Sequence, residues 1–180
     1  MKGGFIMKKI IIVLLVLMVL FVSGGSNEEV IIPKDAIRFR VIANSNNDID
    51  QKNKKKVVAN LTREITYVLS KSNNINDSRL LIKKNMQNFK ENIDNTIKVN
   101  NINQNYKIRY GYNNFPEKKY KGVKYKEGKY ESLVVTLGKG KGKNFWCVLF
   151  PPLCLLEKEE KELDNINYSS LVKETIDKYF

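Results

Sequence analysis

Apolar and polar residues alternate in several short segments of this chain, and the alternation predicts β-strands. Between residues 37 and 43 every second residue is apolar, while Arg38 and Arg40 occupy positions between them, so one face of the segment is expected to be buried. Further strands are predicted by alternation or by β-branched and aromatic content at three places: 106–112, 130–137 and 145–150.

Apolar residues at spacings of three and four predict helices elsewhere. The first helix is expected from Asp50 to Lys71 and the second from about Ser78 to Lys98, each with one apolar stripe facing the core. Ser169–Phe180 is predicted to form a terminal amphipathic helix. The order of strand, two helices, three strands and a helix predicts an α+β fold, in which a small, mainly antiparallel sheet is packed by helices on one face.

The first 25 residues differ from the rest of the chain and predict a signal peptide or an N-terminal anchor. Lys8 and Lys9 precede an unbroken apolar run of 13 residues, Ile10–Val22, which small residues follow. The run is shorter than the roughly 20 residues that span a bilayer, which favours a cleaved signal. Both alternatives place the remainder outside the cytoplasm of the producing cell. Residues 26–36 are expected to be a linker and residues 37–180 a single domain.

Basic residues outnumber acidic ones, and the net charge is +13. Without the first 25 residues, 29 Lys and Arg remain against 19 Asp and Glu, which leaves a charge of +10. Such a charge favours an acidic neighbour, such as phospholipid headgroups, wall polymer or an acidic protein. A solvated lysine surface without a partner is the alternative. Nucleic acid is disfavoured because the chain is expected to be exported.

The sequence contains no histidine, which excludes Ser-His-Asp and Cys-His catalysis, histidine metal sites and an imidazole pH switch. The acidic residues between Glu157 and Glu162 are interleaved with lysine, as on a solvated helix. No carboxylate pair has the apolar surroundings that raise a pKa for acid catalysis. We expect that the protein is not an enzyme and uses no cofactor or metal.

A glycine-rich loop, 138–143, separates the last two predicted strands. It presents Lys139, Lys141 and Lys143 between glycines, and it matches neither the P-loop nor the Gly-x-Gly-x-x-Gly spacing of nucleotide sites. The loop is therefore expected to be either a solvated hairpin loop or a basic contact loop. Pro151-Pro152 ends the strand that follows, because proline donates no hydrogen bond to a sheet.

Two features of the strand after this loop bear on function. Cys147 and Cys154 bracket the proline corner and are the only cysteines. They are either a disulfide, which export permits, or free thiols, and a nucleophilic role is disfavoured because no histidine is present to activate a thiol. Alternation places Trp146 and Val148 on one face of the strand and Phe145 and Cys147 on the other. One of the two aromatic residues is expected to contact a partner, with the loop lysines beside it.

These segments together resemble the stage II sporulation protein R family of endospore-forming bacteria. Arg38–Asn46 resembles the family's opening block, with Asp50-Gln51 and Lys54–Val57 after it. The most specific part is Gly138–Cys154, which combines the glycine loop, the aromatic strand and the proline corner. The resemblance also includes parts of the middle of the chain: Tyr110-Gly111, Phe115-Pro116, Lys118 and Tyr120. The chain departs from the family at Phe145, where Trp is expected, and at Lys126-Glu127, where Pro-Ala is usual.

The resemblance implies a signalling protein. Proteins similar to this one are made in the forespore and exported into the space between the two membranes. There they activate a membrane-embedded aspartic protease of the mother cell, which processes the pro-form of sigma factor E. The expected partner is thus that protease, with an anionic membrane surface as a further candidate. A wall- or membrane-surface enzyme or binding protein that uses the basic charge is the alternative.

Overall fold

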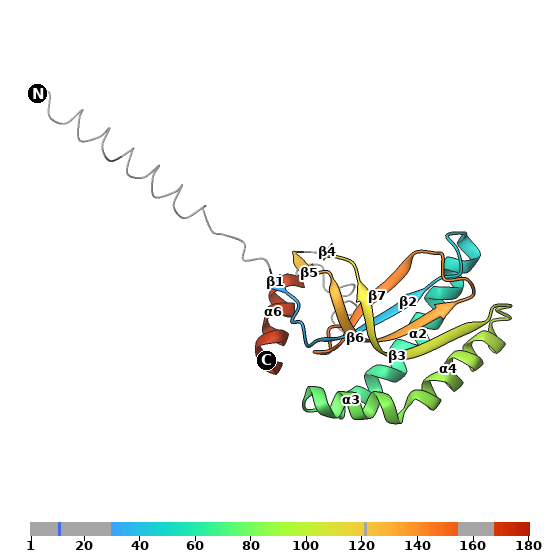
Figure 1. The fold of residues 1–180 in the computed structure, drawn as a ribbon, viewed down its shortest axis with the longest axis horizontal. Coiled ribbons are helices and arrows are strands. Elements are labelled where there is room, and N and C mark those ends of the chain that lie inside the picture. Colours follow the sequence, from blue (N-terminus) through green and yellow to red (C-terminus); the bar gives the residue numbers. More distant parts are fainter. Residues whose placement is uncertain (1–10, 12–29, 121, 155–167) are drawn as a thin grey trace, which may run out of the picture.

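The computed structural model describes residues 11, 30–120, 122–154 and 168–180. The predicted signal peptide, apart from Ile11, and the acidic residues of 157–162 lie outside this part. Among the described residues, no helix is both long enough and apolar enough to cross a bilayer. The elements, labelled as in Figure 1, are β1 (Val30–Ile31), β2 (Ile37–Ile42), α2 (Asp48–Leu69), α3 (Ile75–Lys84), α4 (Met86–Val99), β3 (Tyr106–Phe115), β4 (Lys118–Tyr120), β5 (Val123–Tyr125), β6 (Gly128–Leu137), β7 (Asn144–Phe150) and α6 (Tyr168–Tyr179).

The main sheet has four strands in the order β3-β6-β2-β7. β3 and β6 are antiparallel, as are β2 and β7, whereas the central pair of β2 and β6 is parallel. A parallel pair needs a long crossover connection, and the three helices α2, α3 and α4 lie in the connection between these strands. The α+β class predicted from the sequence is confirmed.

The glycine loop 138–143 does not close a hairpin, and this part of the sequence prediction is wrong. β2 lies between β6 and β7 and pairs with both, so the loop crosses over the end of β2. Alternation identifies strands but carries no information about which strands are neighbours. The loop therefore belongs to the junction where β2 leads into α2.

One face of the main sheet packs against α2, α3 and α4 and forms the main core (Figure 1). α2 begins at the cap Asn47, whose side chain accepts a hydrogen bond from the backbone N–H of Asp50 at 2.7 Å. The second predicted helix is divided at Asn85 into α3 and α4. Its apolar stripe continues through the break because Ile82, Phe89 and Ile93 all enter the same core.

A smaller sheet, in the order β1-β5-β4, packs with α6 at the end of the domain away from α4 (Figure 1). The predicted linker 26–36 contributes β1 to this sheet, and Ile32 and Ala36 are only 2% and 0% exposed. The linker prediction is therefore wrong for residues 30–36. Their apolar side chains pack against Val123 and Val172, partners that lie far along the chain.

Candidate interaction site

Arg38 and Arg40 lie on the face of β2 that points away from the main core, as the alternation predicts. Arg38 is nevertheless only 2% exposed, because aromatic residues cover it. Its guanidinium carbon lies 3.4 Å from the ring centroid of Tyr130, 5.2 Å from that of Phe115 and 5.9 Å from that of Tyr125. Such cation–π contacts compensate in part for the water that a buried guanidinium loses.

The charge of Arg38 has no carboxylate partner within the described part of the chain. One terminal nitrogen donates to the carbonyl oxygen of Lys126 at 3.5 Å, and the buried Nε atom has no hydrogen-bond partner. Burial lowers the pKa of Arg38, and the nearby Tyr130 raises it in part. The guanidinium remains protonated at any physiological pH. A buried donor without an acceptor costs about 1–3 kcal/mol, so this arrangement favours an incoming acceptor.

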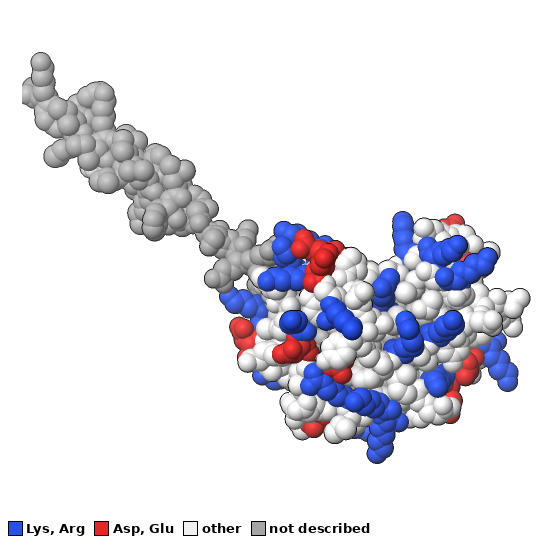
Figure 2. All heavy atoms as spheres, in the orientation of Figure 1, with Lys and Arg blue, Asp and Glu red and all other residues white. Residues whose placement is uncertain are grey.

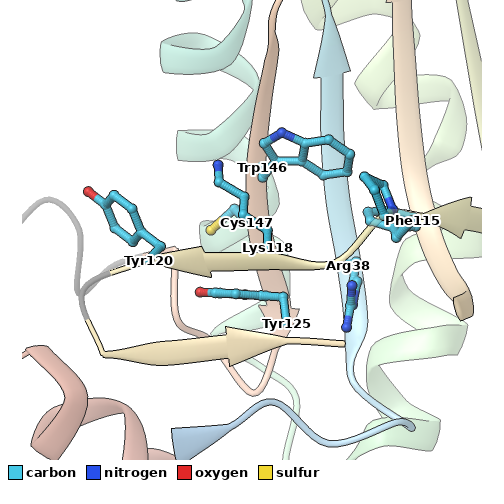
Figure 3. A pocket seen from close by; sticks show the side chains of 8 residues that line it. Arg38, Phe115, Lys118, Tyr120, Tyr125, Trp146 and Cys147 are labelled. Carbon is cyan, nitrogen blue, oxygen red and sulfur yellow. The ribbon is translucent and has the colours of Figure 1, made fainter. Parts of the chain in front are cut away.

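A cavity of about 60 Å³ opens beside Arg38, between the main sheet and the smaller sheet. This volume exceeds what one water molecule needs and is far below the several hundred Å³ of a pocket for a small organic ligand. Figure 3 shows the side chains around it. We call it the Arg38 pocket, and it is lined by Arg38, Phe115, Pro116, Lys118, Tyr120, Tyr125, Trp146 and Cys147.

Trp146 forms one wall of the Arg38 pocket (Figure 3). It lies opposite Arg40 in the strand register, and the guanidinium carbon of Arg40 is 4.5 Å from the indole centroid. Its ring also meets Phe115 edge-on, with the centroids 5.2 Å apart. Phe145 faces the other side of the sheet, packs against the main core and meets Phe39 edge-on at 5.9 Å. Of the two aromatic candidates, Trp146 therefore lines the Arg38 pocket and Phe145 does not.

The three loop lysines do not reach the Arg38 pocket, because the glycine loop lies at the opposite end of β2. Lys139, Lys141 and Lys143 have exposed side chains. Backbone N–H groups of the loop bind the segment between β2 and α2. The N–H of Lys139 donates to Asn44 Oδ1 at 2.9 Å and that of Lys141 to the Asn44 carbonyl at 3.0 Å. The N–H of Gly142 donates to the Ala43 carbonyl at 2.9 Å and that of Lys143 to Asn46 Oδ1 at 2.7 Å.

Glycine at 142 is required by this close crossing. A Cβ atom there would lie 2.2 Å from the carbonyl oxygen of Ser45. The Nζ atom of Lys54 donates to the carbonyl oxygen of Lys143 at 3.0 Å, which holds the other end of the loop. The opening block Arg38–Asn46 and the glycine loop both carry the family resemblance, and in the structure they form one unit.

Asp50 organises the start of this unit. Its carboxylate accepts hydrogen bonds from Ser45 Oγ at 2.6 Å and Asn44 Nδ2 at 2.8 Å, and also from Gln104 Nε2. These bonds, that of Ser45 first, lower the pKa of Asp50 below its ordinary value. Asn44 therefore links the carboxylate to the loop, because its Nδ2 donates to Asp50 while its Oδ1 accepts from Lys139.

Cys147 and Cys154 are joined by a disulfide, and their Cα atoms are 5.6 Å apart, within the usual range for such bonds. The bond connects β7 to the turn after the proline corner, where the Phe150–Pro151 peptide bond is cis. Both cysteines pack against the main core. In this state neither offers a thiol for chemistry.

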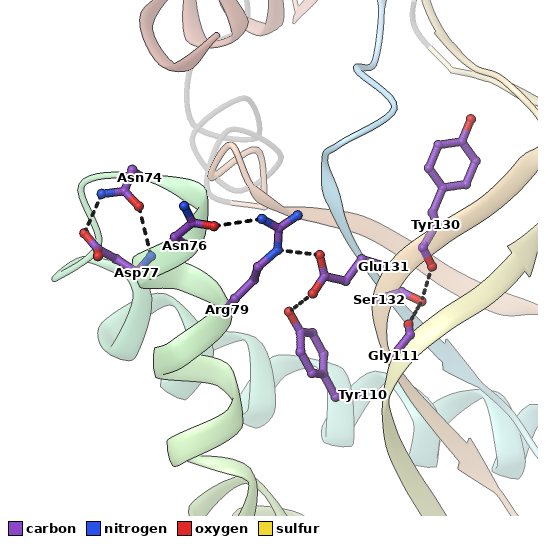
Figure 4. Close-up of polar contacts among 9 residues, drawn as sticks. All are labelled: Asn74, Asn76, Asp77, Arg79, Tyr110, Gly111, Tyr130, Glu131 and Ser132. Atoms are coloured by element: carbon purple, nitrogen blue, oxygen red, sulfur yellow. Dashed lines mark hydrogen bonds and ion pairs between the residues drawn. The ribbon is translucent and has the colours of Figure 1, made fainter.

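A polar cluster on the other edge of the domain connects α3 to the main sheet (Figure 4). Arg79 Nε donates to Glu131 Oε2 at 2.7 Å, and the hydroxyl of Tyr110 donates to Glu131 Oε1 at 2.7 Å. Burial, followed by the bond to Glu131, raises the pKa of Tyr110. Since these groups satisfy one another's hydrogen bonds, the cluster is a structural connection between α3 and the main sheet.

Sequence reasoning missed the Arg38 pocket, since it predicted no helix or strand between residues 112 and 130 and placed Arg38 on the face of its strand opposite the buried one. The available signal was aromatic content: Phe115, Tyr120 and Tyr125 lie in that segment. Within the described residues, no three His, Cys, Asp or Glu side chains are grouped so that they could hold a metal ion.

Comparison with known proteins identifies the family. The family model described as stage II sporulation protein R matches residues 33–160. Stage II sporulation protein R of Bacillus subtilis (strain 168) is 36% identical over 144 residues, which cover 75% of this chain but only 64% of that relative. No solved structure matches the chain. Because the family match includes both the β2 block around Arg38 and the glycine loop, this chain belongs to the stage II sporulation protein R family.

Proposed function

We propose that this chain is an exported sporulation signalling protein that activates a membrane-embedded aspartic protease of the mother cell. The protease would then process the pro-form of sigma factor E. Membership of the stage II sporulation protein R family supports this role. In this proposal the protein acts by binding, so its contact shifts the protease toward an active state that the protease already samples.

The observation that carries a binding role is the Arg38 pocket. It combines aromatic side chains with an arginine, a composition that is enriched at the centres of protein interfaces, and the exposed Lys118 adds a further positive charge. The chain as a whole is basic, with a net charge of +13, and Figure 2 shows Lys and Arg side chains spread over one face of the described residues with fewer acidic ones between them. This surface favours an acidic partner.

Co-expression tests the proposal. The full chain, the protease and a pro-sigma factor E substrate would be produced together in a bacterium that does not sporulate, and substrate cleavage would be followed by immunoblot. Cleavage should require both the chain and its export. Lack of cleavage with a folded, exported chain would contradict the proposal. Binding or degradation of purified peptidoglycan would instead support a wall-surface protein.

A further inference from the structure

We propose that the Arg38 pocket binds the carboxylate side chain of a glutamate or aspartate from an acidic segment of a protein partner. This inference deepens the proposed function and rests on it for the identity of the partner, the receptor protease. The glycine loop and its lysines lie at the other end of β2 and are a separate surface.

The first argument is the unsatisfied charge of Arg38. The residue is 2% exposed, its Nε atom is buried without a partner, and it forms no ion pair with a described carboxylate. Figure 3 shows it at the edge of the cavity, beside Phe115 and Tyr125. A planar guanidinium in this position is suited to a carboxylate, because its nitrogens match the spacing of two carboxylate oxygens.

The second argument is the charge of the lining. Arg38 and Lys118 are the ionised residues of the pocket, and no acidic side chain lines it. Arg40 lies next to the wall, stacked on Trp146, and burial lowers its pKa as it does that of Arg38. Two cations therefore line an opening that contains no anion of the described residues, and a third lies behind one of its walls.

The third argument is size. About 60 Å³ accommodates the end of one side chain but not a folded segment or a nucleotide. A single carboxylate that enters between the aromatic walls would give up its hydrogen bonds to water and accept a charge-assisted hydrogen bond from Arg38 in their place. A membrane surface, in contrast, contacts exposed lysines and does not require a buried arginine.

Binding can be followed directly, because Trp146 is the only tryptophan of the chain and forms a pocket wall. The probe is a short glutamate-rich peptide, and its glutamine counterpart is the matched control. The glutamate peptide should change the Trp146 emission and bind at least tenfold more tightly than the glutamine peptide. Arg38→Gln should remove that difference, and Arg38→Lys should retain part of it.

The control variant is Arg109→Gln. Arg109 is an exposed arginine on the same face of the sheet, and it pairs in register with Val134, which separates it from Arg40. Its replacement removes the same charge and should change peptide binding less than threefold. Circular dichroism and a thermal melt establish that each variant is folded.

Lys118→Gln provides a second test. Lys118 is an exposed residue of the pocket lining, so its replacement does not disturb the interior. The affinity for the glutamate peptide should fall at least threefold.

The co-expression assay separates this inference from the proposed function. If the wild-type chain activates the protease and folded Arg38→Gln activates it equally, the inference is wrong while the proposed function stands. If the wild-type chain does not activate the protease, the proposed function fails, and the peptide comparison then tests the carboxylate site independently.

Equal binding of the glutamate and glutamine peptides would overturn the inference. So would phosphatidylglycerol vesicles that change Trp146 emission and displace the glutamate peptide, since the pocket would then serve a lipid surface.

Discussion

At the scale of single residues, neighbours in one strand have opposite roles. Phe145 packs toward the main core against Phe39, whereas Trp146 lines the Arg38 pocket. The alternation of a strand separates them onto two faces. The sequence alone leaves open which of the two contacts a partner, and the position of the helices assigns Phe145 to the interior.

Alanine substitution should separate these roles. Phe145→Ala should lower the free energy of unfolding by about 2 kcal/mol, since a half-buried phenyl ring is lost from the core. Trp146→Ala should remain folded and lose activation of the protease. Thermal melts and the co-expression assay would measure both effects. If both variants lose activity only by unfolding, β7 is not a contact strand.

Asp50 should make stability depend on pH. Its pKa is lowered in the folded protein, so its contribution is present above the unfolded pKa of about 3.9 and is lost as the pH falls through the folded pKa. Asp50→Asn should therefore melt at a lower temperature than the wild type at pH 7, with the difference shrinking below about pH 4.

The control for this prediction is Asp48→Asn, since Asp48 is an exposed carboxylate in the same helical turn. It should change the melting temperature little at either pH. A difference between wild type and Asp50→Asn that stays constant from neutral to acidic pH would show that the hydrogen bonds to the carboxylate do not depend on its charge.

At the scale of elements, the glycine loop and the proline corner are both held to other elements. Backbone hydrogen bonds hold the loop to the segment between β2 and α2, and a disulfide holds the corner to β7. The loop keeps its shape through backbone groups and glycines, so its lysine side chains are available for charge interactions.

Replacing Lys139, Lys141 and Lys143 together with Gln should therefore leave the melting temperature nearly unchanged. Activation should weaken mildly, because exposed charges mainly change the rate of encounter. Raised salt should partly reproduce the effect in the wild type by screening. Complete loss of activation, or activation that responds to neither change, would contradict this view of the loop.

Cys147→Ser should act through stability. Loss of a bond that closes so short a loop should lower the free energy of unfolding by about 2–3 kcal/mol. Denaturant melts of the wild type with and without reductant should show a similar loss, and Cys154→Ser should match it. Activity should fall in proportion to the folded fraction. A fully folded but inactive Cys147→Ser would point to direct thiol chemistry instead.

At the scale of the whole molecule, location is expected to matter as much as structure. The predicted signal peptide precedes the domain, and the described domain begins with β1, so removal of residues 2–25 does not touch it. The shortened chain should fold and remain in the producing cell, and it should no longer activate the protease. Cell fractionation beside the co-expression assay would test this, and normal activation without export would contradict it.

The sequence by itself determined the α+β class, most of the strand and helix positions and the two faces of β7, because these depend on local periodicity. It did not determine that β2 inserts between β6 and β7, that residues 30–36 join the fold, or that Arg38 is buried. Each of these depends on contacts between segments far apart in the chain. Arg38 is covered by Phe115, Tyr125 and Tyr130, which lie 77 to 92 residues further along the chain, and only the tertiary structure places their rings over a charge that the local pattern assigns to solvent.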